Sequence, residues 1–227
     1  QCGSDPTISR SLGAVPQELI EGRDIVTQDQ VYRSAASGRL YKIPGLQETP
    51  IWIYATILTA MFLHGSLGHL VGNMLYLGIF GDNIENRLGR LRFLIFYIVM
   101  GVAATAAQVA AAAFSVQGLL TPMIGASGAI SGVLGAYMVL FPRNKVYILT
   151  FGVIPLPVSA WIVLGFWFLM QLGNGVSMGP GGSGVAYAAH IGGFLAGWLW
   201  ARVVKAGDKK RGGRNGSDGG VTWRIVD

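Results

Sequence analysis

One continuous stretch of the chain has no charged residue, FLIFYIVMGVAATAAQVAAAAFSVQGLLTPMIGASGAISGVLGAYMVLFP, running from Phe93 to Pro142. A second stretch, from Val146 to Ala201, is likewise free of Asp, Glu, Lys and Arg. Of the 227 residues, 52% are apolar and only 12% are charged, whereas a soluble domain carries roughly 25% charged residues. This shortfall predicts a chain surrounded largely by lipid, and it argues against a secreted, cytosolic or disordered protein.

Apolar segments of about 20 residues are long enough to cross a bilayer as helices. The sequence offers five such segments, separated by short polar or glycine-rich breaks. They are Leu67–Glu85, Leu91–Ala113, Ser127–Phe141, Ile154–Leu172 and Val185–Val204. We therefore predict an all-α fold, a polytopic membrane helix bundle with five spans. The third segment is short and rich in glycine, so we expect its neighbours to shield it from lipid.

The segment before the first span has a different character. Ile51–Leu63 is apolar but too short to cross a bilayer, so we expect it at the membrane interface. Gly65 and Ser66 then form a break, in which Ser66 is a candidate N-cap for the first span.

The charge distribution predicts an orientation and the domain limits. Basic side chains follow the first and third predicted spans and fill the C-terminal tail, whereas the connections 114–124 and 173–184 have no charge. By the positive-inside rule, the basic connections and the tail lie on the cytoplasmic side, and we expect a prokaryotic plasma membrane. We divide the chain into an outer polar and interfacial region (1–66), a transmembrane core (67–204) and a disordered cytoplasmic tail (205–227).

Several classes of partner are disfavoured by the residues. The basic side chains sit in short breaks and are not interleaved with aromatic ones along a groove, which argues against nucleic-acid binding. The single cysteine, Cys2, excludes an internal disulfide and a thiolate zinc site. Three imidazoles could bind a metal, but His64 and His69 are five residues apart, about 140° around a helix, and no H-E-x-x-H motif is present. We expect no metal and no cofactor.

All three histidines, His64, His69 and His190, lie in or beside apolar segments. Ionisable groups there are costly and commonly functional, although a neutral histidine can also serve to pack helices together. His69 and Asn73 are four residues apart and share one helix face, where both could donate hydrogen bonds to a developing negative charge. Ser127 begins the third predicted span, so its backbone N–H belongs to the unpaired amides of a helix N-terminus and is a third potential donor.

A serine hydroxyl is a weak nucleophile until a base removes its proton, and histidine is the usual base near neutral pH. His190 lies near the outer end of the last span, so we expect it at a depth similar to that of Ser127. Asp82 and Glu85 belong to the cytoplasmic end, which leaves no acidic residue for the third place of a triad. The residues therefore predict a Ser–His dyad, Ser127 and His190, with donors for the oxyanion.

Small residues recur at helical spacing in the third and last predicted spans. They are Gly128, Gly132, Gly135, Gly193 and Gly197. Small residues let membrane helices approach closely. We expect these two spans to pack tightly and to bring Ser127 towards His190.

Four separated motifs follow one another between about Thr56 and Ala201. They are Met61-Phe62-Leu63-His64-Gly65 with His69-x-x-x-Asn73, Gly81-Asp82-Asn83-Ile84-Glu85 with Arg87, Gly125-Ala126-Ser127-Gly128-Ala129, and Ala189-His190-Ile191-Gly192-Gly193 with Gly197. Together and in this order, they resemble the rhomboid family of intramembrane serine proteases. The resemblance implies Ser127 as nucleophile, His190 as general base, and an oxyanion hole formed by His69, Asn73 and the Ser127 amide. It also implies transmembrane protein substrates, cleaved near the outer leaflet through an acyl-enzyme.

The chain departs from the family pattern at two points. The rhomboid core has six spans, so the resemblance implies that a first span is missing before residue 1. Family members often have an aromatic residue four positions after the nucleophile, packed on the histidine, whereas this chain has Ser131 there. Another group must then hold the His190 ring.

Two other functions are alternatives to proteolysis. A catalytically silent rhomboid-like binder of membrane proteins would be expected to lose the serine or the histidine, and this chain keeps both. A transporter or proton relay would be expected to have acidic residues within its spans, and Phe93–Pro142 has none.

Overall fold

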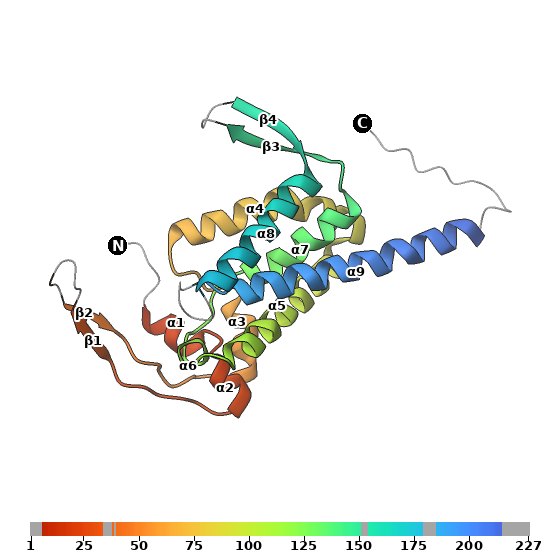
Figure 1. Cartoon of the computed structure of the whole chain (residues 1–227). Helices are drawn as coiled ribbons and strands as arrows, with labels where there is room; N and C mark the ends of the chain where they lie inside the picture. The colour runs from red at the N-terminus through yellow and green to blue at the C-terminus, as the bar shows by residue number, and fades with distance from the viewer. Residues whose placement is uncertain (1–5, 34–37, 39, 151–153, 179–184, 215–227) are drawn as a thin grey trace.

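The computed structural model describes residues 6–33, 38, 40–150, 154–178 and 185–214 (Figure 1). Helices dominate this part of the chain, as predicted. In chain order the elements are α1 (Pro6–Leu12), α2 (Pro16–Glu21), β1 (Gln30–Arg33), β2 (Leu40–Ile43), the 3-10 helix η1 (Ile53–Ala55), α3 (Thr56–Ala60), α4 (Leu67–Leu88), α5 (Arg90–Ala112), α6 (Val116–Leu119), α7 (Ser127–Leu140), β3 (Lys145–Thr150), β4 (Ile154–Ser159), α8 (Ala160–Met178) and α9 (Tyr187–Arg214).

The centre of the molecule is α7, which packs against α9, α5, α4 and α8 and is buried along most of its length. The contact with α9 depends on glycine. A Cβ added at Gly135 would overlap the carbonyl of Phe194, and one added at Gly197 would overlap the carbonyl of Gly132. The predicted shielding of this short helix and its close approach to the last helix are both confirmed.

The number of membrane spans stays a prediction. By length and composition, α5 and α8 are the helices of the described residues that are long and apolar enough to cross a membrane. The helix α7 is apolar but shorter. For α4, α7 and α9 the expectation of a span therefore rests on the sequence and on their packing beside α5 and α8.

Two antiparallel hairpins correct the all-α expectation. Their registers are Gln30↔Ile43 to Arg33↔Leu40 for β1–β2, and Lys145↔Ser159 to Thr150↔Ile154 for β3–β4. The predicted fourth span, Ile154–Leu172, begins as β4, and its helix starts only at Ala160. Pro155 and Pro157 explain the difference, because proline has no N–H and its ring disrupts a helix interior, whereas an edge strand tolerates it.

The last helix is longer than predicted. We expected a span over Val185–Val204 and a disordered tail over 205–227, but α9 runs from Tyr187 to Arg214. Contacts with other helices hold the first part of this extension. Lys205 Nζ donates to the carbonyl of Val139 at 3.0 Å, and Asp208 pairs with Arg87 at 2.5 Å. The remainder of the predicted tail lies outside the described residues.

The outer region packs on the end of the bundle where α7 begins. Figure 1 shows α1, α2, α3 and α6 gathered at this end, while the end of α9 extends beyond the opposite one. Ala14 and Met123 form an antiparallel bridge with N–H···O distances of 3.1 and 2.9 Å, and Gly125 N–H donates to the carbonyl of Ala60 at 2.8 Å. The loop that leads to Ser127 is therefore held from two sides.

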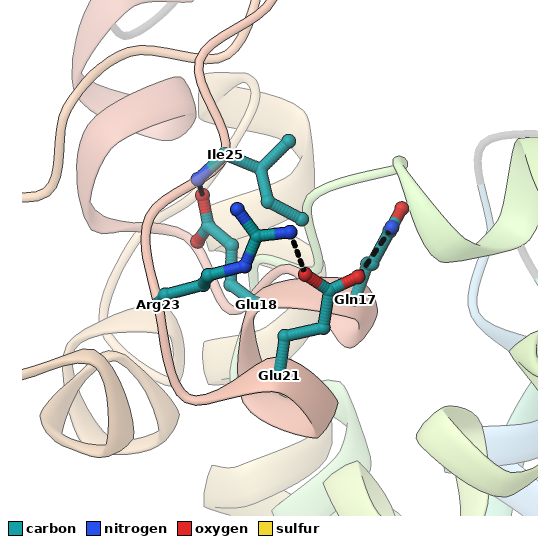
Figure 2. A network of polar contacts seen from close by, with 5 residues as sticks. All are labelled: Gln17, Glu18, Glu21, Arg23 and Ile25. Carbon is teal, nitrogen blue, oxygen red and sulfur yellow. Dashed lines mark hydrogen bonds and ion pairs between the residues drawn. The ribbon is translucent and has the colours of Figure 1, made fainter.

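A network of polar contacts surrounds α2 in this outer region (Figure 2). Glu18 is 1% exposed, and its carboxylate accepts a hydrogen bond from Ile25 N–H at 3.1 Å. Burial raises the pKa of the Glu18 carboxyl, and this outweighs the opposite effect of the Ile25 N–H. Glu21, on the exposed side of α2, accepts instead from Gln17 at 2.7 Å and pairs with Arg23 at 2.6 Å.

Candidate active site

The first part of the site comes from α4. Ser66 is its N-cap, since its hydroxyl accepts from His69 N–H at 3.1 Å, which confirms the prediction. One turn later, Asn73 is buried, and its Nδ2 donates to the carbonyl of His69 at 2.9 Å. An amide nitrogen carries two hydrogens, so a second N–H of Asn73 remains for the cavity that this residue lines.

The second part is the start of α7, where Ser127 is the first helical residue. Gly125, two positions earlier, has a φ of 116°, and a Cβ added there would lie 2.7 Å from Cε1 of His69. Only glycine therefore lets this loop pass directly beside the His69 ring. The helical ladder opens with Ile130 N–H donating to the carbonyl of Ala126, so the Ser127 N–H precedes it and keeps its donor capacity.

The third part is His190, in the first turn of α9. Its Nε2 lies 2.8 Å from Oγ of Ser127, although 63 positions separate the two residues in the sequence. The structure thus brings together the hydroxyl and the imidazole of the predicted dyad.

A cavity of about 550 Å³ lies over this pair. It is bordered by side chains of α4, α5, α7, α8 and α9 and by the loop before α7, and most of its lining is apolar. Its polar lining includes His69, Asn73, Gln108, Ser127 and His190. A carbonyl entering the cavity would therefore meet a hydroxyl, an imidazole and several hydrogen-bond donors within one mostly apolar enclosure.

Two buried amides of the site were missed by the sequence analysis. Gln171 of α8 places its Oε1 2.8 Å from Nδ1 of His190. Gln108 of α5 accepts the N–H of Ala189 at 3.1 Å, at the first turn of α9. Each is a polar side chain in a charge-free apolar segment, Phe93–Pro142 for Gln108 and Val146–Ala201 for Gln171, so the rule that selected the histidines could have selected them as well.

The third histidine, His64, takes a different place. Its ring lies edge-on to that of His69, with 5.2 Å between the ring centroids. Among the described residues, no group of three or more His, Cys, Asp and Glu side chains is placed to hold a metal ion. The expectation that the protein uses no metal or cofactor stays a prediction.

Comparisons of this chain with known proteins all point to the same family. The model of the rhomboid domain matches residues 52–206. The chain is 31% identical over 174 residues to Rhomboid protein 1, mitochondrial, of Saccharomyces cerevisiae, covering 76% of this chain and 48% of that protein. It is 30% identical to RHOMBOID-like protein 12, mitochondrial, of Arabidopsis thaliana (66% and 46% covered). It is 32% identical to Rhomboid protease GluP of Bacillus subtilis (65% and 25% covered).

The expected location is corrected by these relatives. Most of the matched proteins named above are mitochondrial, so the prediction of a prokaryotic plasma membrane, with a cytoplasmic tail, is wrong. The positive-inside rule orients a chain relative to a membrane and does not tell which membrane it is. The chain spans about half the length, or less, of these relatives. Because the rhomboid domain nevertheless covers more than half of the chain, the chain belongs to the rhomboid family.

Proposed function

We propose that this chain is an intramembrane serine endopeptidase that cleaves transmembrane proteins near the outer leaflet. The observation that carries the proposal is the 2.8 Å hydrogen bond between Ser127 Oγ and His190 Nε2 beneath an apolar cavity. A relative named as a rhomboid protease supports it further. The mitochondrial names among the relatives support a mitochondrial membrane as the location.

The proposed reaction proceeds in two halves. Ser127 Oγ attacks the carbonyl carbon of the scissile peptide while its proton passes to Nε2 of His190. The tetrahedral intermediate collapses when His190 returns this proton to the departing amine, which leaves an ester on Ser127. Water then attacks the ester while one of its protons passes to Nε2 of His190. The second tetrahedral intermediate collapses when His190 gives this proton to Ser127 Oγ, which releases the carboxylic acid and restores the serine hydroxyl.

The oxyanion of each intermediate needs fixed donors. The N–H of Ser127 and side-chain N–H groups of His69 and Asn73 line the same cavity, and donors aimed at the developing charge are worth more where water is scarce. The turn at Gly125, two residues before Ser127, supports this assignment because it allows the His69 ring to lie directly beside the loop that leads to Ser127.

The substrate must present an exposed carbonyl. In an intact transmembrane helix each carbonyl is bonded within the helix, so the proposed substrate is a transmembrane segment that unwinds locally. The cavity, at about 550 Å³, has room for a few residues of extended chain and for the hydrolytic water.

Cleavage of a tagged single-pass membrane protein in proteoliposomes tests the proposal. We expect two fragments with the wild-type chain and none with Ser127→Ala or His190→Ala. Ser177→Ala, at an exposed serine of α8, is the matched control and should cleave normally. Cleavage that survives in Ser127→Ala would contradict the proposal. Capture of the substrate without cleavage by the wild type would favour a silent rhomboid-like binder.

A further inference from the structure

A histidine that acts as a general base must present an unprotonated nitrogen to its target. In this chain Nε2 of His190 faces the Ser127 hydroxyl at 2.8 Å. In a neutral imidazole, Nε2 can accept only when the single ring proton is on Nδ1. A hydrogen-bond acceptor beside Nδ1 stabilises that tautomer and also fixes the plane of the ring.

Gln171 places an oxygen at this position. It lies on α8, is 8% exposed, and its Oε1 is 2.8 Å from Nδ1 of His190. One turn earlier on the same helix, Trp167 sets its ring 6.0 Å from the imidazole, measured between centroids. The helix α8 therefore contributes both a hydrogen-bond partner and a ring neighbour to His190.

The residue one turn after the nucleophile is engaged elsewhere. Ser131 is buried, and its hydroxyl donates to the carbonyl of Ser127 at 2.6 Å. This bond runs along α7 itself, so the Ser131 side chain is directed at its own helix backbone. Support for the imidazole comes from α8 and from Tyr187, whose ring is perpendicular to it at 6.3 Å.

We propose that Gln171 is the positioning residue for His190, in the place where soluble serine proteases have a carboxylate. Its amide oxygen accepts the Nδ1–H both before and after Nε2 takes the serine proton, so the ring keeps its orientation throughout the reaction. A neutral amide costs less to bury than a carboxylate in a lipid-surrounded site. The segment Val146–Ala201, which supplies both Gln171 and His190, accordingly contains no acidic residue.

The orientation of the amide decides the chemistry. If Nε2 of Gln171 faced His190, it would donate to Nδ1 and the ring proton would move to the other nitrogen. His190 would then donate to Ser127 and could not accept its proton. The tautomer of His190 is therefore a direct readout of the role assigned to Gln171, and it does not depend on the proposed protease function. The kinetic consequences do rest on that function.

Substitutions that keep or remove the acceptor oxygen of residue 171 test the predicted effect of Gln171 on kcat. Gln171→Met preserves length without the oxygen, and we expect kcat to fall on the order of 100-fold, the lower end of what a positioned general base contributes, with KM nearly unchanged. Gln171→Glu restores an oxygen acceptor and should recover most of kcat. Gln117→Met, the same change at an exposed glutamine of α6, should have no effect. Unchanged kcat in Gln171→Met, or equal losses in Gln171→Met and Gln171→Glu, would overturn the proposal.

Nitrogen-15 NMR of histidine-labelled protein in detergent tests the tautomer itself. The His190 signals are assigned by their absence in His190→Ala. In the wild type we expect a proton on Nδ1 and none on Nε2, and a shift towards the other tautomer in Gln171→Met. A wild-type His190 protonated on Nε2 would overturn the proposal even if the protein proves to be an active protease. An inactive wild type that has the expected tautomer would instead count against the proposed function alone.

Discussion

Single hydrogen bonds between buried or half-buried side chains connect the residues of the site. Ser127, His190 and Gln171 come from three different helices and form a chain of two bonds, each 2.8 Å long. Their surroundings are mostly apolar, where hydrogen bonds are electrostatically stronger and unpaired groups are more costly than in water. Removing any one member should therefore affect the other two.

The proposed oxyanion donor Asn73 gives a graded prediction. Asn73→Ala removes one donor and leaves the nucleophile and base intact, so kcat should fall on the order of 100-fold without being abolished. Steady-state cleavage of the membrane substrate measures this. Asn86→Ala, at an exposed asparagine of the same helix, is the control. Equal kcat for Asn73→Ala and the wild type would exclude Asn73 from the oxyanion hole.

The buried Glu18 gives a prediction on pH and stability. Its pKa is raised in the folded protein, mainly by burial, so the protonated form favours folding and this contribution is lost as the pH rises through the folded-state pKa. Glu18→Gln is uncharged at every pH. We expect it to raise the Tm at neutral pH and to match the wild type at acidic pH.

Glu21, three residues further along α2, is the control for Glu18. Its pKa is lowered, chiefly by the hydrogen bond from Gln17, so Glu21→Gln should not raise the Tm at neutral pH. Thermal unfolding of both variants in detergent, from acidic to neutral pH, measures how the Tm of each differs from that of the wild type. A Tm of Glu18→Gln below that of the wild type at neutral pH would contradict the assignment.

At the scale of elements, local signals were readable from the sequence, whereas only some of the long-range contacts were. The Gly65-Ser66 break located the start of α4, because an N-cap acts within one turn. Hydropathy alone extended the fourth span back to Ile154, although two prolines there favour a strand. The sequence marks Gln171 as a polar residue of an apolar segment but not as a partner of His190, because the two residues lie on different helices and periodicity in one helix says nothing about its neighbour.

The contact between α7 and α9 gives a prediction at the element scale. Gly197→Ala would place a methyl group against the backbone of Gly132, where no flexible side chain can move aside. Overpacking of this kind typically costs about 1–3 kcal/mol, so we expect a Tm lower by several degrees and a large loss of cleavage as Ser127 and His190 separate.

Gly78→Ala is the matched control for this helix contact. A Cβ at Gly78 of α4 would meet no atom within 4 Å, and alanine favours a helix over glycine by about 1 kcal/mol. Its Tm should equal or exceed that of the wild type. Similar Tm values for Gly197→Ala and Gly78→Ala in detergent would show that close helix approach does not stabilise the fold.

In the whole molecule, the outer region and the helix bundle together shape the site. The loop before Ser127 is held by the bridge between Ala14 and Met123 and by the hydrogen bond from Gly125 to Ala60. It lies at the end of the bundle where α1, α2, α3 and α6 gather (Figure 1). The sequence predicted the family and the dyad residues through motifs. The compartment that it predicted was wrong, because hydropathy and charge describe a bilayer and not the organelle that contains it.

The most direct test of the account is reaction of the detergent-solubilised chain with a fluorophosphonate, which modifies serine only where a base activates it. We predict a single adduct, mapped by peptide mass spectrometry to Ser127, that is lost in His190→Ala and retained in Ser177→Ala. An adduct on another serine, or labelling of Ser127 that persists in His190→Ala, would contradict the claim that Ser127 and His190 form one catalytic unit.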